Sequence, residues 1–190
     1  MMNRLFIKIK RRLGTWASRR CFFKGFKKNG GVIDSNIKLI LLGDFSYGKN
    51  ITINNDGIDN DCRSQICVLQ GASLKIGDNT GMSQVAITCA KRIVIGSNVK
   101  IGAGTLIFDT NFHSTDYRLR RNRVDDSNNS IKADVVIEDD CFIGARCIIG
   151  KGVHIGARSI IAAGSVVVKD IPRDCIAGGN PCRVIKQIDN

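Results

Sequence analysis

The sequence predicts an all-β solenoid, because its C-terminal half carries an internal repeat of short apolar units. A β-branched residue recurs every six positions, at Ile137, Ile143, Ile149, Ile155, Ile161 and Val167. Small residues lie four positions after members of this series, at Cys141, Cys147, Val153, Ser159 and Ser165. An α-helix repeats every 3.6 residues, so it cannot keep a six-residue period on one face. The pattern instead fits short strands joined by tight turns, with branched residues inside the strands and small residues inside the turns.

Two further features belong to the same repeat. Glycine follows three of the branched positions, at Gly144, Gly150 and Gly156, and we expect these glycines to take backbone angles that other residues avoid. The six-residue phase also occurs earlier in the chain, at Ile76 and Met82 and again at Ile95, Ile101 and Ile107. Before Ile76 the pattern weakens, which indicates an irregular first coil of the kind that caps solenoids.

Composition narrows the class and locates the charge. The chain has 190 residues, of which 43% are hydrophobic, enough for one domain with one core. The net charge is +12, but residues 1–33 alone hold ten basic residues and no acidic one. The rest of the chain is therefore nearly neutral, and we expect no nucleic-acid partner. No apolar run is long enough to span a membrane or to form a secretory signal, so we expect a cytoplasmic protein with reduced thiols.

Residues 1–33 form a basic N-terminal arm, separate from a β-helical domain at residues 34–188. Apolar residues in the arm share one helical face, at Leu5, Ile9, Leu13 and Trp16, so the arm is predicted to be helical. Three interpretations stay open. Residues 1–28 could lie on an anionic membrane surface at the inner face, the helix could pack on a partner subunit, or the arm could be a cleaved transit peptide.

The repeat breaks between Ile107 and Ile131, which predicts a loop at residues 113–130 that protrudes from the solenoid. A long loop on a rigid scaffold is a usual place for function. His113, one of two histidines, begins this loop. The other, His154, lies inside a regular unit and is expected to be exposed on the outer surface. A tail at residues 172–190 ends the domain.

Three stretches resemble the hexapeptide-repeat O-acetyltransferases: residues 109–114, residues 163–172 and residues 178–185. The resemblance covers about residues 70–188 and is to galactoside and maltose acetyltransferases and to polysaccharide and lipopolysaccharide O-acetyltransferases. The fold of that family is a left-handed parallel β-helix, in which three hexapeptides make one triangular coil. The left hand is implied by the resemblance alone, because the usual crossover rule favours the right hand.

The resemblance implies acetyl transfer from acetyl-CoA to a sugar hydroxyl, in surface polysaccharide or lipopolysaccharide synthesis, with His113 as the general base. An imidazole pKa of about 6.5 suits a base near neutral pH. Asp109, Asp116 or a backbone carbonyl could orient the other ring nitrogen. The implied acceptor-binding residues are Ser83, Gln84, Asp109 and Asn111. Galactoside acetyltransferases have an Asn at about the position of Gln84, so the acceptor contacts here are expected to differ.

The resemblance also places acetyl-CoA along the prism, between neighbouring subunits of a homotrimer, and it implies no metal. The implied coenzyme contacts are Ala145, Ala163, Val168, Lys169, Arg183 and Lys186. Small side chains at Ala145 and Ala163 would let the pantetheine approach the backbone. The three cations would bind its phosphates, or they are ordinary surface charges. The arginines of the loop could bind an anionic sugar or nucleotide, or they are simply solvated: Arg118, Arg120, Arg121 and Arg123.

Other functions fit the residues to different degrees. A γ-type carbonic anhydrase needs more histidine ligands than this chain has, and a serine acetyltransferase normally carries a larger helical N-terminal domain. A xenobiotic (antibiotic) acetyltransferase stays open, because the same His113 and the same coils would serve it. A non-catalytic β-helix scaffold also stays open, since fold alone does not give function, and binding of acetyl-CoA would discriminate it.

The cysteines show no Cys-x-x-Cys spacing, so the usual zinc or redox motif is missing. Cys141 and Cys147 occupy the small position of the repeat, where we expect them to pack. Cys62 and Cys67 lie in a poorly patterned region, and for them either packing or a metal or thiol role stays open.

Overall fold

A computed structural model describes residues 26–34, 36–57 and 63–189. The described residues do not include the predicted helical stripe of the arm, the segment expected to contact a membrane up to residue 25, or Cys62. The described part of the arm begins with a helical turn at residues 26–28. In the described part of the chain, no helix has the length and apolar character needed to cross a membrane.

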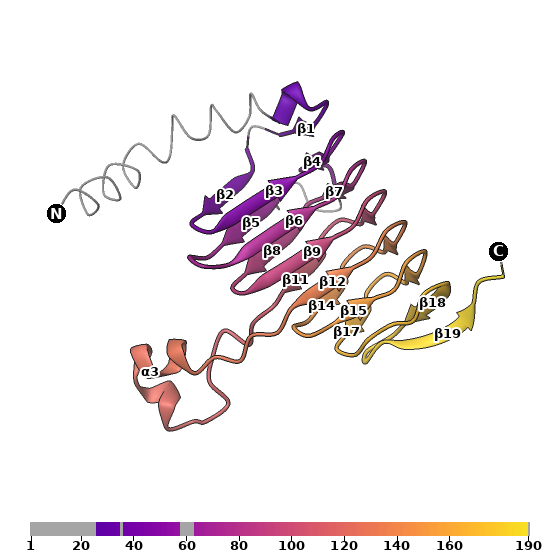
Figure 1. Cartoon of the computed structure of the whole chain (residues 1–190). Helices are drawn as coiled ribbons and strands as arrows, with labels where there is room; N and C mark the ends of the chain where they lie inside the picture. The colour runs from indigo at the N-terminus through magenta and orange to yellow at the C-terminus, as the bar shows by residue number, and fades with distance from the viewer. Residues whose placement is uncertain (1–25, 35, 58–62, 190) are drawn as a thin grey trace.

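Short strands wind through three sheets, which we call A, B and C, and these form the faces of a prism (Figure 1). Sheet A contains β1 (Val32–Ile33), β4 (Thr52–Asn54), β7 (Gly81–Ser83), β10 (Lys100–Ile101), β13 (Phe142–Ile143), β16 (Ile160–Ile161), β18 (Cys175–Gly178) and β19 (Arg183–Gln187). Sheet B contains β2 (Lys38–Leu41), β5 (Gln65–Val68), β8 (Ala86–Cys89), β11 (Leu106–Phe108), β14 (Ile148–Ile149) and β17 (Val166–Val167). Sheet C contains β3 (Asp44–Tyr47), β6 (Ser73–Ile76), β9 (Arg92–Ile95), β12 (Val135–Ile137) and β15 (His154–Ile155).

The strands within each sheet pair in parallel, and only the terminal pair β18 and β19 is antiparallel. From β1 to β17, consecutive strands enter A, B and C in turn, so each of these coils places one strand on each face. The predicted fold class, an all-β left-handed parallel β-helix, is confirmed.

The six-residue repeat builds the core. Each step of six moves the chain to the next sheet, so residues three steps apart stack in register: Ile143 on Ile161, Ile149 on Val167 and Ile137 on Ile155. All these side chains are buried, and so are the earlier members of the series. Burial of branched side chains stabilises such a stack by about 1.5–3 kcal/mol for each residue.

The small positions line the insides of the turns. Cys141 and Cys147 are buried, and their thiols lie 3.2 and 3.3 Å from backbone carbonyls one coil further on, those of Gly156 and Ala162. The hydroxyl of Ser159 makes the equivalent bond to Pro172, at 2.6 Å. At these three positions a small side chain fills the turn and also donates a hydrogen bond, whereas the apolar Val153 fills the same position of its turn.

The glycines of the repeat have a different purpose from the expected one. Gly144 and Gly156 do not take left-handed backbone angles. A Cβ at Gly144 would instead lie 2.5 Å from the backbone nitrogen of Ala163 in the next coil. The left-handed angles fall two residues later, at Arg146 (φ +57°) and Arg158 (φ +61°). Glycine is thus required for the close approach of successive coils.

Left-handed residues also stack along the corner between sheets C and A. Asn50, Asn79, Asn98 and Asp140 all have φ between +54° and +61°. Their side chains form a ladder, with amide donors 3.0, 3.2 and 3.0 Å from the next acceptor. Asn and Asp tolerate this conformation better than most residues, and the ladder adds a bond at each coil.

The first coil is more regular than its sequence indicates. Strands β1, β2 and β3 pair in register with β4, β5 and β6, and Leu39 lies opposite Ile66. The six-residue period is lost because the connections between these strands vary in length. Phe26 is buried and its ring lies 4.8 Å from that of Tyr47, so it covers the N-terminal end of the core.

Candidate active site

A long insertion leaves the prism between β11 and β12, at the corner between sheets B and C (Figure 1). Its neck is narrow, since Thr110 and Lys132 form an antiparallel bridge. The backbone N–H of Asn111 also donates to the carbonyl of Ile131 at 2.9 Å. Beyond the neck the chain forms a short 3₁₀ helix, η1 (Leu119–Arg121), and a helix, α3 (Arg123–Asn128).

His113 lies just beyond the neck, and its side chain is 70% exposed. Its Nδ1 is 2.6 Å from Oδ2 of Asp126, a residue of α3 whose side chain is only 13% exposed. The other oxygen of Asp126 accepts a hydrogen bond from the backbone N–H of Ser114 at 2.7 Å. The hydrogen bond with His113, followed by that from Ser114, holds the pKa of Asp126 below its usual value.

Asp126 was not among the groups expected to orient His113. Asp116 instead accepts hydrogen bonds from the Nε and Nη2 of Arg118, at 3.0 and 2.7 Å. Asp109 faces away from the insertion. The loop has no periodicity, so no pattern in it indicated that residues thirteen positions apart would meet.

Two side chains stabilise the framework of the loop. Asn122 caps α3, because its side-chain oxygen accepts from the backbone N–H groups of Val124 and Asp125. Arg120 donates from Nη1 to the carbonyls of Ser114 at 2.7 Å and Thr115 at 3.1 Å. The segment that carries His113 is therefore fixed on both sides.

Three of the four arginines of this loop have partners. Arg118 pairs with Asp116, Arg120 binds backbone carbonyls, and the guanidinium of Arg121 lies 5.4 Å from the centre of the Tyr117 ring. These contacts favour a part in loop structure over an open cluster of cations.

Asp109 is completely buried in the wall of the prism. Its Oδ1 and Oδ2 accept hydrogen bonds from the backbone N–H groups of Ala90 and Lys91, at 2.7 and 2.8 Å. The thiol of Cys89 lies 3.5 Å from Oδ2, and burial together with the Asp109 charge raises the pKa of that thiol to about 12. Asp109 is thus not open to an acceptor in this chain, whereas Asn111 is exposed.

A second group of predicted residues lies at a different corner, between sheets A and B. Gln84 is 5% exposed, has φ +44°, and donates from Nε2 to the carbonyl of Asn55 at 3.0 Å. Ser83 ends β7 beside it. Further along the same corner come Ala145 and Ala163, in successive coils joined by the bond from Gly164 N–H to the Ala145 carbonyl at 2.8 Å.

The predicted site is therefore divided between two corners of one chain. Val168 and Lys169 follow β17 and lie toward the corner that carries His113, and both are exposed. Arg183 and Lys186 lie on β19 at the end of sheet A, also exposed. One prism does not bring Gln84 and His113 to the same corner.

Comparison with known proteins places this chain among named acetyltransferases. Residues 134–169 match the family model described as the hexapeptide repeat of succinyl-transferase. The chain is a relative of the hexapeptide-repeat acetyltransferases. Galactoside O-acetyltransferase of Escherichia coli K12 is 31% identical over 146 residues, which are 77% of this chain and 58% of that protein. The resemblance seen in the sequence is thereby confirmed.

Two other similar proteins are an N-acetyltransferase and an acetyltransferase of known structure. A 2,3,4,5-tetrahydropyridine-2,6-dicarboxylate N-acetyltransferase of Alkaliphilus metalliredigens is 51% identical over 55 residues, 29% of this chain and 23% of that protein. The structure of a hexapeptide-repeat-containing acetyltransferase of Vibrio cholerae, complexed with acetyl coenzyme A, is 27% identical with a TM-score of 0.58. That match covers 96% of this chain and 85% of the other. The chain spans less than two thirds of the length of the curated relatives it matches.

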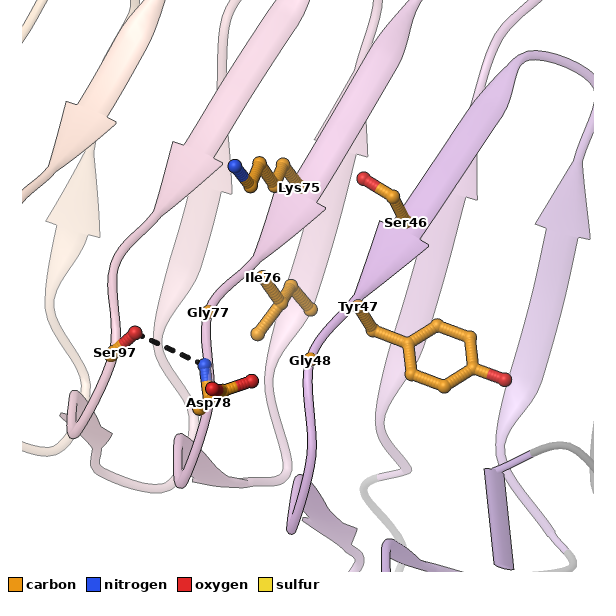
Figure 2. A pocket seen from close by; sticks show the side chains of 8 residues that line it. All are labelled: Ser46, Tyr47, Gly48, Lys75, Ile76, Gly77, Asp78 and Ser97. Carbon is orange, nitrogen blue, oxygen red and sulfur yellow. Dashed lines mark hydrogen bonds between the residues drawn. The ribbon is translucent and has the colours of Figure 1, made fainter. Parts of the chain in front are cut away.

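Among the residues that the structure describes, shallow hollows lie on two faces of the hexapeptide-repeat prism. One lies on sheet A, where Thr52, Gly81, Lys100 and Phe142 form a row across four strands and Gly81 contributes no side chain; it extends to Ser83. Figure 2 shows the other, on sheet C, where Ser46 and Lys75 point outward from neighbouring strands and Ser97 accepts a hydrogen bond from the Asp78 N–H at 3.1 Å. Only the hollow on sheet A touches a predicted site residue.

Proposed function

We propose that this hexapeptide-repeat protein transfers the acetyl group of acetyl-CoA to a sugar hydroxyl, in the synthesis of a surface polysaccharide or lipopolysaccharide. The observation that carries the proposal is the position of His113. It is an exposed imidazole at the base of the insertion, held by a carboxylate at 2.6 Å, on a scaffold shared with named acetyltransferases.

The reaction needs one proton carrier. His113 accepts the proton of the acceptor hydroxyl while the hydroxyl oxygen forms a bond to the thioester carbonyl carbon. The tetrahedral intermediate then collapses, the carbon–sulfur bond breaks, and the leaving thiolate takes a proton from the imidazolium. General-base action of this kind contributes about 10²- to 10⁴-fold in rate.

The corner between sheets A and B suits the coenzyme. Ala145 and Ala163 present only methyl groups there, so a narrow pantetheine chain can lie against the backbone. Arg183 and Lys186, both exposed on β19 at the end of sheet A, supply charge for the phosphates. Lys169 and Val168 lie toward the corner between sheets B and C, so a neighbouring subunit would bring their charge and apolar surface to the coenzyme. This assignment of acetyl-CoA is supported by the acetyl coenzyme A in the related Vibrio cholerae structure.

A homotrimer would complete the site. His113 lies at the corner between sheets B and C, whereas Gln84, Ala145 and Ala163 lie at the corner between sheets A and B. If neighbouring subunits pack with these two corners facing each other, the base of one chain meets the coenzyme track of the next. The division of the site between two corners is the feature that favours this assembly.

Thermal unfolding and turnover together test the proposal. Acetyl-CoA at about 100 times its Kd should stabilise the fold by about 2.7 kcal/mol. We expect the same stabilisation in His113→Ala, with transfer to sugars, measured as free thiol, reduced at least about a hundredfold. His154→Ala is the matched control, since it removes the other histidine, which is exposed on sheet C.

Each contrary result has its own meaning. Unchanged turnover in His113→Ala would refute the assignment of His113 as the general base. An absence of any shift with acetyl-CoA would favour the non-catalytic scaffold. Transfer to an antibiotic but to no sugar would support the xenobiotic acetyltransferase, and transfer only to amines would move the acceptor class toward that of the N-acetyltransferase relatives.

A further inference from the structure

The side chains of His113 and Asp126 are in contact but differ in their exposure to solvent. The imidazole is 70% exposed, but the carboxylate that binds it is 13% exposed. A surface carboxylate is normally solvated and mobile, and an ion pair at such a site contributes little. Asp126 is instead held under the segment that it binds, with one oxygen on the His113 ring and the other on the Ser114 N–H.

The position of Asp126 is set by α3. The backbone N–H of Asp126 donates to the carbonyl of Asn122 at 2.9 Å, and the Asn122 side chain caps the first turn. Arg120 holds the opposite side of the loop through the carbonyls of Ser114 and Thr115. The carboxylate thus meets His113 as part of a preformed arrangement.

The chemistry of the pair then fixes the imidazole tautomer. The pKa of Asp126 is lowered, so its side chain is ionised near neutral pH and can only accept hydrogen bonds. A neutral imidazole that binds it must therefore carry its hydrogen on Nδ1, which leaves the lone pair on Nε2. The exposed edge of the ring is then the basic edge.

We propose that Asp126 is a positioning residue, which holds His113 as the Nδ1–H tautomer and directs Nε2 toward the acceptor hydroxyl. This inference rests on the proposed function of His113 as the base. After His113 takes the proton, the same carboxylate stabilises the imidazolium, in the way that the Asp of a Ser-His-Asp triad does.

Asp126→Asn tests the inference with little change in shape. The amide oxygen can still accept from Ser114, but the amide nitrogen would face Nδ1 as a donor and favour the Nε2–H tautomer. We expect kcat to fall about 10²- to 10⁴-fold, with KM for acetyl-CoA within about twofold of wild type. Asp125→Asn is the matched control, because it removes an equal charge from the neighbouring, exposed position of α3.

The tautomer itself can be observed by ¹⁵N NMR. The chain has two histidines, so the His154→Gln background leaves His113 as the one signal. We expect hydrogen on Nδ1 in this background and its transfer toward Nε2 when Asp126→Asn is added. Asp125→Asn should leave the signal unchanged.

The outcomes separate this inference from the proposed function. Hydrogen on Nε2 in the wild-type loop, or a full kcat in folded Asp126→Asn, would overturn the part given to Asp126. A full kcat in His113→Ala would overturn the assignment of His113 as the general base, and with it this inference about Asp126. If Asp126→Asn fails to fold, the tautomer of the wild-type loop still decides.

Discussion

The carboxylate of Asp109 lies 2.8 Å from the backbone nitrogen of Lys91, inside the wall of the β-helix. A residue that begins the stretch shared with acetyltransferases is thus tied to the preceding coil. The contact anchors the point from which the insertion leaves, because the carbonyl of Asp109 also accepts from the N–H of Ala133, where the insertion returns.

Asp109→Asn should therefore lower stability. An amide can replace only one of the two acceptor oxygens, so one half-buried N–H, of Ala90 or Lys91, loses its partner. We expect a loss of about 2 kcal/mol in the free energy of unfolding, measured with urea. Asp125→Asn, exposed on α3, should change it by less than about 0.5 kcal/mol. Full stability in Asp109→Asn would contradict this anchoring part.

The tetrapeptide Ile-Gly-Ala-Arg occurs twice and offers a matched test of the coenzyme track. Ala145 lies in the first copy, at the corner between sheets A and B, and Ala157 lies in the second, at the corner between C and A. Ala145→Leu should weaken acetyl-CoA binding about tenfold or more, because a bulky side chain would obstruct the pantetheine. Ala157→Leu should leave binding unchanged in the same calorimetric titration. Equal effects in both variants would remove the corner assignment.

The thiol of Cys147 occupies a turn position that two later units fill with serine, at Ser159 and Ser165. Cys147→Ser should cost less than about 1.5 kcal/mol, because the hydroxyl can bond the Ala162 carbonyl as the thiol does. Cys147→Leu should cost about 1–3 kcal/mol or more through overpacking. Thermal unfolding of the two variants would measure the contrast, and a well-tolerated leucine would show that the turn is not tightly packed.

Acid should weaken the C-terminal coils through Asp174. Its hydrogen bonds with Arg158 hold its pKa below the ordinary value of 3.8. A carboxyl whose pKa is lower in the folded state stabilises the fold above its unfolded pKa, and this contribution is lost as pH falls through the folded pKa. Asp174→Asn should therefore be less stable at pH 7 and show a shallower decline below about pH 4. Urea unfolding across this range measures both, with exposed Asp189→Asn as control; identical curves for Asp174→Asn and wild type would refute the prediction.

The core of the fold could be predicted from sequence because the six-residue period of the apolar positions equals the length of chain on one face of the prism. Each residue of the series ending in Val167 lies one sheet further on, so the spacing directly encodes the triangular coil. The first coil escaped this reasoning, since its connections differ in length while its strands still pair in register. Gly144, Gly150 and Gly156 were expected to supply unusual backbone angles, but these angles fall two positions later, at Arg146, Gly152 and Arg158. Gly144 and Gly156 instead allow the coils to approach.

Only part of the candidate site could be predicted from sequence. The break in the six-residue repeat located the insertion and His113, because the repeat is regular on both sides of it. Asp126 had no such signal, since contacts within an irregular loop depend on how α3 folds back. The division between two corners was also hidden, because it depends on the sheet at which each turn falls.

The neck of the insertion makes the loop structurally separable from the prism. Its two arms leave and return side by side, joined by the bridge between Thr110 and Lys132, so the coils above and below meet only a closed corner. Strands β11 and β12, on either side of the insertion, pair with strands of the neighbouring coils and not with the helices beyond that bridge. This segment can therefore be exchanged, extended or rebuilt while these strand pairs stay as they are, so that new chemistry can be added to an unchanged architecture.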